Sequence, residues 1–331
     1  LVDTVCKGGV IEACIVQTIA GLAAVRAKTF IDSTGDAFLS RAAGVPYERG
    51  YEKTGNNQPL SFRFEMGGID VDRLYQHVAV ELKEDWCKSK PPYFEIAEAM
   101  HRKQRYKLED LMAKGVAAGE ITQEEAEYMQ AYTIIGKNGV MSMNCPEIPV
   151  KFSASDPVSY SKAVTYGRKM MHHIANYLIR HLPGFEKAFI SREAAMLGAR
   201  ESWRIRGRHY LVEDDYHNQS RFADAVCRTA WFIDAHGEKV SEKLPKGGFY
   251  EIPYGSLVTE QIENLLVTGR CISASFILQA SMRIQPTCMS IGEAAGIAAA
   301  WGVTHKIAAN ALKWEEIPAD KRSYVSAGGK S

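Results

Sequence analysis

The sequence predicts an α/β fold, because short apolar runs are closed by glycine turns and followed by helical stretches. Residues 265–267 are Leu-Leu-Val and end at Thr268-Gly269-Arg270, a pattern typical of a buried strand and its turn. Pro286 fits the first turn of a helix, where its missing N–H is harmless. Residues 288–301 are rich in glycine and alanine, so one face of this helix carries little bulk and can approach a sheet closely.

The end of this strand and the start of the following helix together predict an anion-binding point. The first N–H groups of a helix lack partners within the helix, and the helix dipole adds positive potential there. Arg270 and Arg283 bring further positive charge. An ordinary strand–loop–helix crossover with surface arginines explains the spacing equally well, because one glycine-rich turn is a weak signal.

A second strand with a glycine turn lies near the start of the chain. Residues 2–6 and 10–18 are expected to form a hairpin that turns at Gly8-Gly9. Residues 27–32 form a further strand, which ends in Ser33-Thr34-Gly35-Asp36 and precedes a helix-prone segment. Asp36 is expected either to cap that helix or to contact a ligand.

The remaining elements are assigned from the hydrophobic period and from turn residues. Thr122 and Glu125 fit a capping box, which begins a helix. In chain order we expect a loop at 50–59, a strand at 60–66, one or two helices within 103–131, a strand-like stretch at 136–153, a helix at 159–181, a strand at 191–195, a short helix at 223–231 and a loop at 234–249.

An arginine-rich stretch precedes the last third of the chain, with five arginines between Arg192 and Arg208. A structural interpretation pairs these arginines with nearby acids, namely Glu201, Glu213, Asp214 and Asp215. In the functional interpretation they form a cationic wall that faces an anionic substrate, since guanidinium forks fit carboxylates.

Composition limits the classes of function. The chain has 331 residues, enough for one large domain or two ordinary ones, and 46% are apolar. With 40 basic and 39 acidic residues and no charged tail, a nucleic-acid partner has little support. The seven cysteines contain no CxxC pair and no metal spacing, so reduced thiols in a cytoplasmic protein are expected. No run of 18 apolar residues occurs, so no membrane span is expected.

Several motifs together resemble one enzyme family. Asn264–Ala274 and Arg283–Gly296 are similar to the C-terminal flavin-contacting segment of FAD-dependent oxidoreductases with a glutathione-reductase-type (GR2-like) FAD domain. Ser33-Thr34-Gly35-Asp36 resembles the family's Ala-Thr-Gly-Asp strand end. The segments 200–211 and 250–257 are also similar to the family, although Trp203 replaces the first of two adjacent arginines.

The resemblance implies a three-layer FAD-binding domain with a central parallel sheet and an inserted β-rich α+β substrate domain. The FAD domain would be discontinuous, at 1–45 and 256–315, with the substrate domain at 46–255 and a tail at 316–331. Such domains open with a strand, a GxGxxG turn and a helix that holds the FAD pyrophosphate. No GxGxxG occurs here, and the chain begins at Leu1 within a strand-like pattern, so we expect an incomplete domain.

The resemblance also implies the chemistry, a hydride transfer between FAD and a small organic substrate, for which the cationic wall predicts an anionic group. The implied catalytic residues are Arg200 and Cys288, although packing alone would also explain Cys288. The implied cofactor-binding residues are Thr34, Gly35, Asp36, Gly269, Arg270, Arg283, Thr287, Met289, Gly292 and Gly296. Two alternatives follow from the absent GxGxxG turn. The chain is either a non-catalytic remnant or assembly subunit, or one part of a split enzyme whose partner chain supplies that turn.

Overall fold

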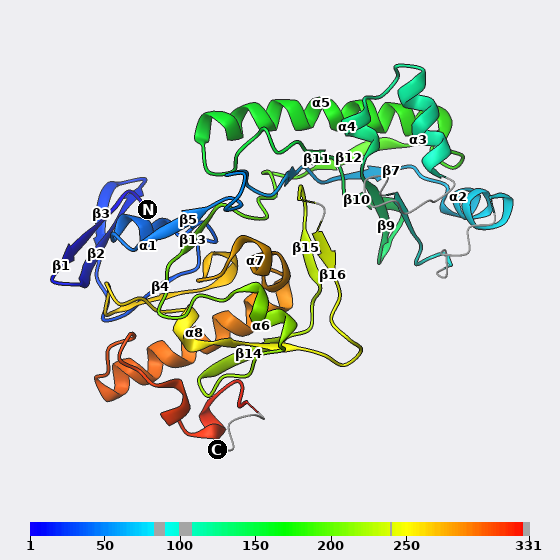
Figure 1. Ribbon diagram of the computed structural model, residues 1–331. Coiled ribbons are helices and arrows are strands. Elements are labelled where there is room, and N and C mark those ends of the chain that lie inside the picture. Colours follow the sequence, from blue (N-terminus) through cyan, green and yellow to red (C-terminus); the bar gives the residue numbers. More distant parts are fainter. Residues whose placement is uncertain (83–89, 99–107, 239, 327–331) are drawn as a thin grey trace. The chain divides into compact units, whose positions relative to one another are not determined.

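The computed structural model describes residues 1–82, 90–98, 108–238 and 240–326. These residues form two compact units (Figure 1). Unit 1 consists of Leu1–Gln58 and Arg200–Ser331, and unit 2 consists of Pro59–Ala199. The mixed α/β architecture expected from the sequence is confirmed.

The buried centre of unit 1 is a parallel pair of short strands. Strand β4 (Phe30–Asp32) lies beside β18 (Leu265–Val267), with Phe30 opposite Leu265 and Asp32 opposite Val267. All three residues of β18 are buried, as expected for a strand covered on both faces. Helix α8 (Gln285–His305) packs on this pair, and its buried small residues make the close approach possible; they include Ala294, Ala295 and Ala298.

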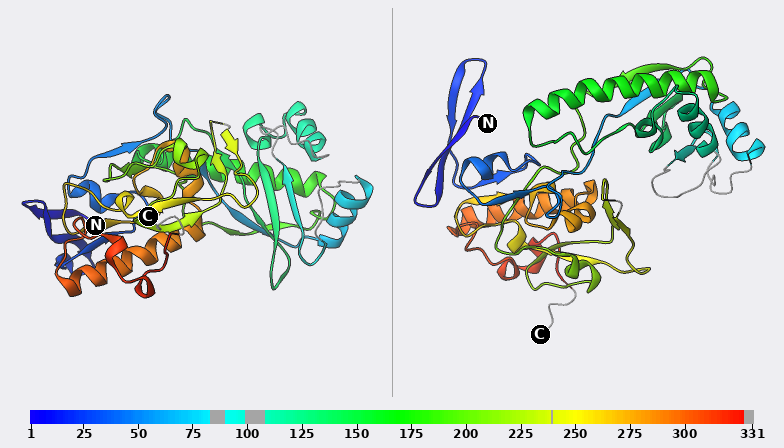
Figure 2. Two further views of the ribbon diagram at one scale, coloured as in Figure 1. Left: turned by 60° about the horizontal axis from the view of Figure 1, so that its bottom comes forward. Right: turned by 45° about the horizontal axis from the view of Figure 1, so that its top comes forward.

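A three-stranded antiparallel sheet stands at the edge of unit 1 (Figure 2). It contains β1 (Asp3–Lys7), β2 (Val10–Thr18) and β3 (Gly21–Val25). The hairpin predicted with a turn at Gly8-Gly9 is therefore confirmed, but β3 was not foreseen. Leu22 and Val25 of β3 are 67% and 49% exposed, so apolar surface of this sheet is open.

Unit 1 is completed by short strands and helices around the parallel pair. They are α1 (Phe38–Ala42), β5 (Tyr47–Arg49), β13 (Trp203–Ile205), α6 (Glu213–His217), β14 (Ala225–Thr229), β15 (Ile233–Ala235), β16 (Val240–Glu242), β17 (Tyr250–Pro253) and α7 (Phe276–Met282), with 3₁₀ turns at Tyr254–Ser256, Gly269–Cys271, Trp314–Glu316 and Ala319–Lys321.

Three sequence-based expectations for unit 1 are wrong. The segment 223–231 is not a helix, because β14 pairs with the buried strand β17 and buries residues on both of its faces. The stretch 234–249, expected to be a loop, includes the β15–β16 hairpin. The segment between Arg270 and Pro286, also expected to be a loop, contains α7, whose helix starts at the side-chain cap Ser275.

Unit 2 is built on a five-stranded antiparallel sheet with one long helix on it. The strand order is β12 (Phe189–Glu193), β7 (Phe64–Gly67), β10 (Lys137–Met143), β9 (Met129–Ile134) and β8 (Glu95–Glu98). Helix α5 (Pro157–His181) begins at the cap Asp156 and buries Met171, Ile174 and other apolar residues against one face of this sheet. The long helix expected at 159–181 is confirmed.

The rest of unit 2 follows the sequence pattern in part. The predicted strand at 60–66 is divided into β6 (Leu60–Ser61) and β7, and β6 pairs with β11 (Glu147–Ile148). Helix α3 (Leu108–Ala117) and α4 (Gln123–Ala126) occupy part of the predicted helical stretch, and the capping box at Thr122 and Glu125 is confirmed. Residues 103–107 lie outside the described part, and 129–131 belong to β9. Helix α2 (Val71–Tyr75) continues as a π-helix, Gln76–Glu81.

The units divide the chain differently from the sequence-based domains. Unit 1 contains residues 46–58 and 200–255, which the sequence analysis placed in the substrate domain. The reason is strand pairing, since β5 pairs with β13 and β14 with β17 inside unit 1. The assignment of FAD binding to one unit and of substrate binding to the other stays a prediction.

Candidate functional site

The turns after β4 and β18 meet at one edge of the parallel pair. The Thr268 N–H donates to the Asp32 carbonyl at 2.9 Å, and the Thr268 hydroxyl donates to Ser33 Oγ at 3.0 Å. Thr34-Gly35 and Gly269 therefore lie at the same sheet edge. This carboxyl edge is where ligands bind in open α/β sheets.

The first turn is held together by a buried carboxylate. Asp32 Oδ1 accepts from the N–H and hydroxyl of Thr34, and Oδ2 accepts from the N–H and hydroxyl of Ser40. The Thr34 hydroxyl oxygen also accepts from the Phe38 N–H at 3.0 Å. Asp32 and Thr34 therefore satisfy the start of α1, and the expected helix cap by Asp36 is wrong.

Asp36 is committed to an arginine instead. Its Oδ1 accepts from Arg270 Nη2 at 2.8 Å and from the Ser202 hydroxyl. The guanidinium lies against Gly35, where an added Cβ would stand 2.5 Å from Arg270 Nη1. The neighbour that occupies the space left by the missing Cβ of Gly35 is therefore Arg270.

Replacing Gly35 by alanine is expected to destabilise unit 1 in two ways. Gly35 has φ +74°, where an alanine costs about 1–2 kcal/mol, and displacing Arg270 from Asp36 adds about 1 kcal/mol for a partly exposed pair. Gly44 is the matched control, because it has φ +83° and no atom within 4 Å of an added Cβ. Urea unfolding of both alanine variants measures the difference. In an Arg270→Ala background the two substitutions should cost the same, and a difference that persists there would contradict the proposed clash.

A buried glutamine connects the turn after β18 to the arginine-rich segment. Gln279 on α7 donates through Nε2 to the carbonyls of Arg270 and Arg200, at 3.2 and 3.0 Å. Its Oε1 accepts from Gln58 Nε2 at 2.9 Å. The backbone of Arg200 is thus brought to the same sheet edge as Arg270, while the role expected for its half-buried side chain stays a prediction.

Helix α8 begins beside this edge without a side-chain cap. Its first-turn Thr287 hydroxyl donates to Thr229 Oγ1 at 3.0 Å, and Arg283 lies 4.0 Å from the Asp234 carboxylate. Burial raises the pKa of the Cys288 thiol, although Arg270 and Arg283 lower it in part. Burial thus outweighs the lowering of a thiol pKa that a helix start favours, and the catalytic role of Cys288 stays a prediction.

Several predicted cofactor-binding residues stand open. A Cβ added at Gly269, Gly292 or Gly296 would meet no atom within 4 Å, and Met289 is 74% exposed. Open glycine backbone beside an uncapped helix start suits a flat ligand with a polar or anionic edge. The residues around the turn of β18 and along α8 therefore fit a flavin nucleotide, whereas Gly35 and Asp36 are engaged by Arg270.

The structural interpretation of the arginine-rich stretch is confirmed for one pair, the buried ion pair of Glu201 and Arg204, whose side chains are 0% and 1% exposed. Arg204 Nε donates to the Ala274 carbonyl at 2.9 Å and Nη2 to the Gly50 carbonyl at 3.2 Å. Of the other acids expected to pair with these arginines, Glu213 accepts from the Ser275 hydroxyl and Asp215 lies 3.8 Å from His209. Trp203 instead packs under Arg41, whose Cζ is 3.6 Å from the ring centre.

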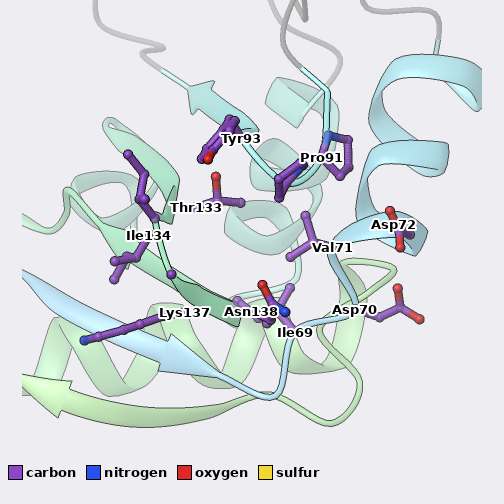
Figure 3. Close-up of a pocket in the computed structure, with 14 residues that line it drawn as sticks. Ile69, Asp70, Val71, Asp72, Pro91, Tyr93, Thr133, Ile134, Lys137 and Asn138 are labelled. Atoms are coloured by element: carbon purple, nitrogen blue, oxygen red, sulfur yellow. The ribbon is translucent and has the colours of Figure 1, made fainter.

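Unit 2 has a cavity of about 640 Å³ that no sequence motif suggested (Figure 3). It lies between the start of α2, the turn at Pro91–Tyr93 and the β9–β10 hairpin. Its polar groups are largely used within the protein: Asp70 caps α2, Thr133 accepts from the Phe94 N–H and Lys137 pairs with Glu65. Figure 3 shows Lys137 pointing away from Tyr93 and Thr133.

The sequence profile of one family, described as FAD dependent oxidoreductase, matches residues 1–320. The chain belongs to the FAD-dependent oxidoreductase family. The resemblance seen in the motifs is confirmed at this level, and so is FAD as the cofactor of the family. Among the described residues, no group of three or more His, Cys, Asp or Glu side chains could hold a metal ion, and no helix is long and apolar enough to cross a membrane.

A solved structure of a flavin-dependent brominase, a triple mutant of Bmp2, is 13% identical, with a TM-score of 0.37. The match covers 95% of this chain and 52% of that one, so the chain spans about half the length of the brominase. No curated protein matches the chain.

Proposed function

We propose that the chain is part of a flavoenzyme in which unit 1 is a glutathione-reductase-type FAD domain and unit 2 binds a small organic substrate. The observation that carries this proposal is the meeting of the β4 and β18 turns at one sheet edge, beside the uncapped start of α8. Membership of the family indicates FAD as the cofactor, and the open sheet edge is the place that we propose for it. The six described cysteines are all free, which supports a reducing, cytoplasmic location.

FAD, when bound, would supply hydride chemistry, and the protein would orient it and adjust its potential. Residues that would hold it are those that stand open at the edge, namely Gly269, Met289, Gly292 and Gly296, with the backbone N–H of the buried Thr287 at the start of α8. Arg270 would add positive charge while remaining fixed by Asp36. The N–H groups at the start of α8 would favour negative charge that develops on the ring when it is reduced.

We also propose that a strand–turn–helix segment, from a partner chain or from elsewhere in the same protein, completes unit 1. Within the described residues, β4 pairs with β18 alone, so its outer edge has no strand beside it. Parallel sheets are normally covered on both faces, and open edges are rare. Ile31 on β4 and Val303 on α8 are each 37% exposed, which gives the added segment apolar surface to bury.

Flavin titration tests both proposals. This chain alone is expected to bind FAD weakly or not at all, because the completing segment would carry most contacts to the phosphates. Co-expression with a strand–turn–helix segment that contains GxGxxG should give a yellow complex with one FAD. Isolation of this chain alone with stoichiometric FAD would contradict the completing segment. Absence of FAD from the complete protein would contradict the flavoenzyme itself.

A further inference from the structure

The open face of the unit 2 sheet carries an ordered polar network. On β7, β9 and β10, one set of alternate residues packs against α5, and the other set faces away from this core. Gln130 and Tyr132 of β9 and Asn144, just after β10, lie on the outward set. The polar residues of this face are linked by hydrogen bonds to Arg63, which precedes β7.

The network fixes the orientation of Asn144. Its Nδ2 donates to Gln130 Oε1 at 2.7 Å and to the Tyr128 hydroxyl at 3.0 Å. The Tyr128 and Tyr132 hydroxyls also donate to Gln130 Oε1. Burial raises the pKa of Tyr132, so its hydroxyl keeps the proton that it donates. Because the Asn144 amide nitrogen is held by these acceptors, its oxygen must face the opposite way.

Arg63 is the residue that this oxygen holds. Its Nε donates to Asn144 Oδ1 at 2.9 Å, so the terminal Nη1 and Nη2 groups are left for another partner. No carboxylate among the described residues lies within ion-pair distance of Arg63. An arginine whose Nε is anchored and whose outer fork is unpaired is preorganised for an anion with two oxygens.

Arg63 lines a depression of about 220 Å³ together with Ser142, Arg192 and two acids, Glu65 and Glu193. Glu65 is 3.0 Å from Lys137, and Glu193 is 3.2 Å from Arg168. Arg192 is only loosely paired, at 4.0 Å from Glu65, and its side chain is 72% exposed. Because Lys137 and Arg168 are the nearer partners of the two acids, the depression retains positive charge from Arg63 and Arg192.

We propose that this depression binds the carboxylate of a small organic acid on the fork of Arg63, with Arg192 and the Ser142 hydroxyl beside it. A guanidinium fork matches the two oxygens of a carboxylate. The nearby Glu65 and Glu193 disfavour a doubly charged phosphate more than a singly charged carboxylate. The volume is below that of typical drug-sized sites, about 300–1,000 Å³, so the acid has few carbon atoms. The inference rests on the proposed function only in regarding this acid as the substrate.

The test measures binding without flavin, so its result is independent of the flavoenzyme proposal. Acetate, succinate and benzoate are titrated into the full chain by calorimetry, with acetamide as the uncharged control and inorganic phosphate as the competing anion. At least one carboxylate should bind saturably, and acetamide should not. Binding of phosphate alone, or of none of the acids, would overturn the proposal.

Variants then assign the binding to Arg63. Arg63→Gln is expected to weaken it at least about tenfold, or 1.4 kcal/mol, and Arg63→Lys by less, because the charge is kept but the fork is lost. Arg180→Gln is the matched control, since Arg180 is an exposed arginine of unit 2 that pairs with Glu120 and does not line the depression. Thermal unfolding of each variant checks the fold. If Arg63→Gln and Arg180→Gln bind the acid equally, the site is not at Arg63.

Discussion

Replacing Arg204 by alanine is expected to cost unit 1 about 3–5 kcal/mol in free energy of unfolding, because it leaves the buried Glu201 carboxylate without its charged partner. The same change removes the bonds from Arg204 to the Ala274 and Gly50 carbonyls. A loss of this size is a large part of the stability of an ordinary domain. Urea unfolding, followed by circular dichroism, measures it.

Arg206 provides the control from the same segment. It pairs with Glu48, but its side chain is 45% exposed, so Arg206→Ala should cost about 0–1 kcal/mol. Replacing both members of the buried pair, Glu201→Leu with Arg204→Met, should recover most of the loss, since no unpaired charge is then buried. If Arg204→Ala lowers the free energy of unfolding as little as Arg206→Ala does, the buried pair does not stabilise unit 1.

The loss caused by Arg204→Ala should also depend on pH. Burial raises the pKa of Glu201, and Arg204 offsets part of that effect, so removing Arg204 raises the pKa further. A carboxyl whose pKa is higher in the folded state than in the unfolded state binds more protons when the protein is folded. Stability therefore falls as the pH rises from the unfolded-state pKa to the folded-state pKa. The free energy of unfolding of the variant should therefore be closer to that of the parent at a pH of about 5 than at a pH of about 8. An unchanged difference across this range would contradict an unpaired Glu201.

Replacing Arg200 by alanine in the complete, flavin-loaded protein is expected to lower turnover about 10²–10³-fold, the loss typical of one preorganised donor in a dry site. Flavin content should change little, because Arg200 meets the site edge through its carbonyl, which accepts from Gln279 and remains in the variant. The measurements are flavin absorbance per chain and the rate of flavin reduction or reoxidation by the substrate.

Arg206→Ala again serves as the control, because Arg206 belongs to the same arginine-rich segment but pairs with Glu48. It should leave turnover unchanged. If the turnover of Arg200→Ala stays within about threefold of the parent, the Arg200 side chain stabilises the transition state by less than about 1 kcal/mol. Arg200 would then be structural, and the substrate would lie elsewhere.

Local patterns predicted much of the site. The apolar run at 265–267, the glycine turns after it and after 30–32, and Pro286 at the start of α8 all had clear sequence signals, and all lie as expected. The capping box at Thr122 was equally readable, since its two hydrogen bonds join residues three positions apart. Short-range chemistry decided these elements.

Other elements could not be predicted because distant pairing outweighs local propensity. The segment 225–229 has helical spacing but becomes a strand, because its partner, 250–253, presents a buried edge for it. The hairpin of β15 and β16 has a polar sequence typical of a loop, and pairing of its two halves makes it a sheet. Ser275 could have indicated α7, since serine is a common helix cap, but the apolar residues after it matched a buried strand as well.

By itself, then, the sequence determined the α/β class, the family motifs and the two turns that form the sheet edge, because each depends on neighbouring residues. Only the tertiary structure decided which charges meet. Arg270 reaches Asp36 across 234 positions and rests on Gly35, and Arg204 bonds to Gly50 across 154. No local period encodes such distances. Charged groups find these partners only after the strands pair, since a buried charge must be compensated wherever the fold places it.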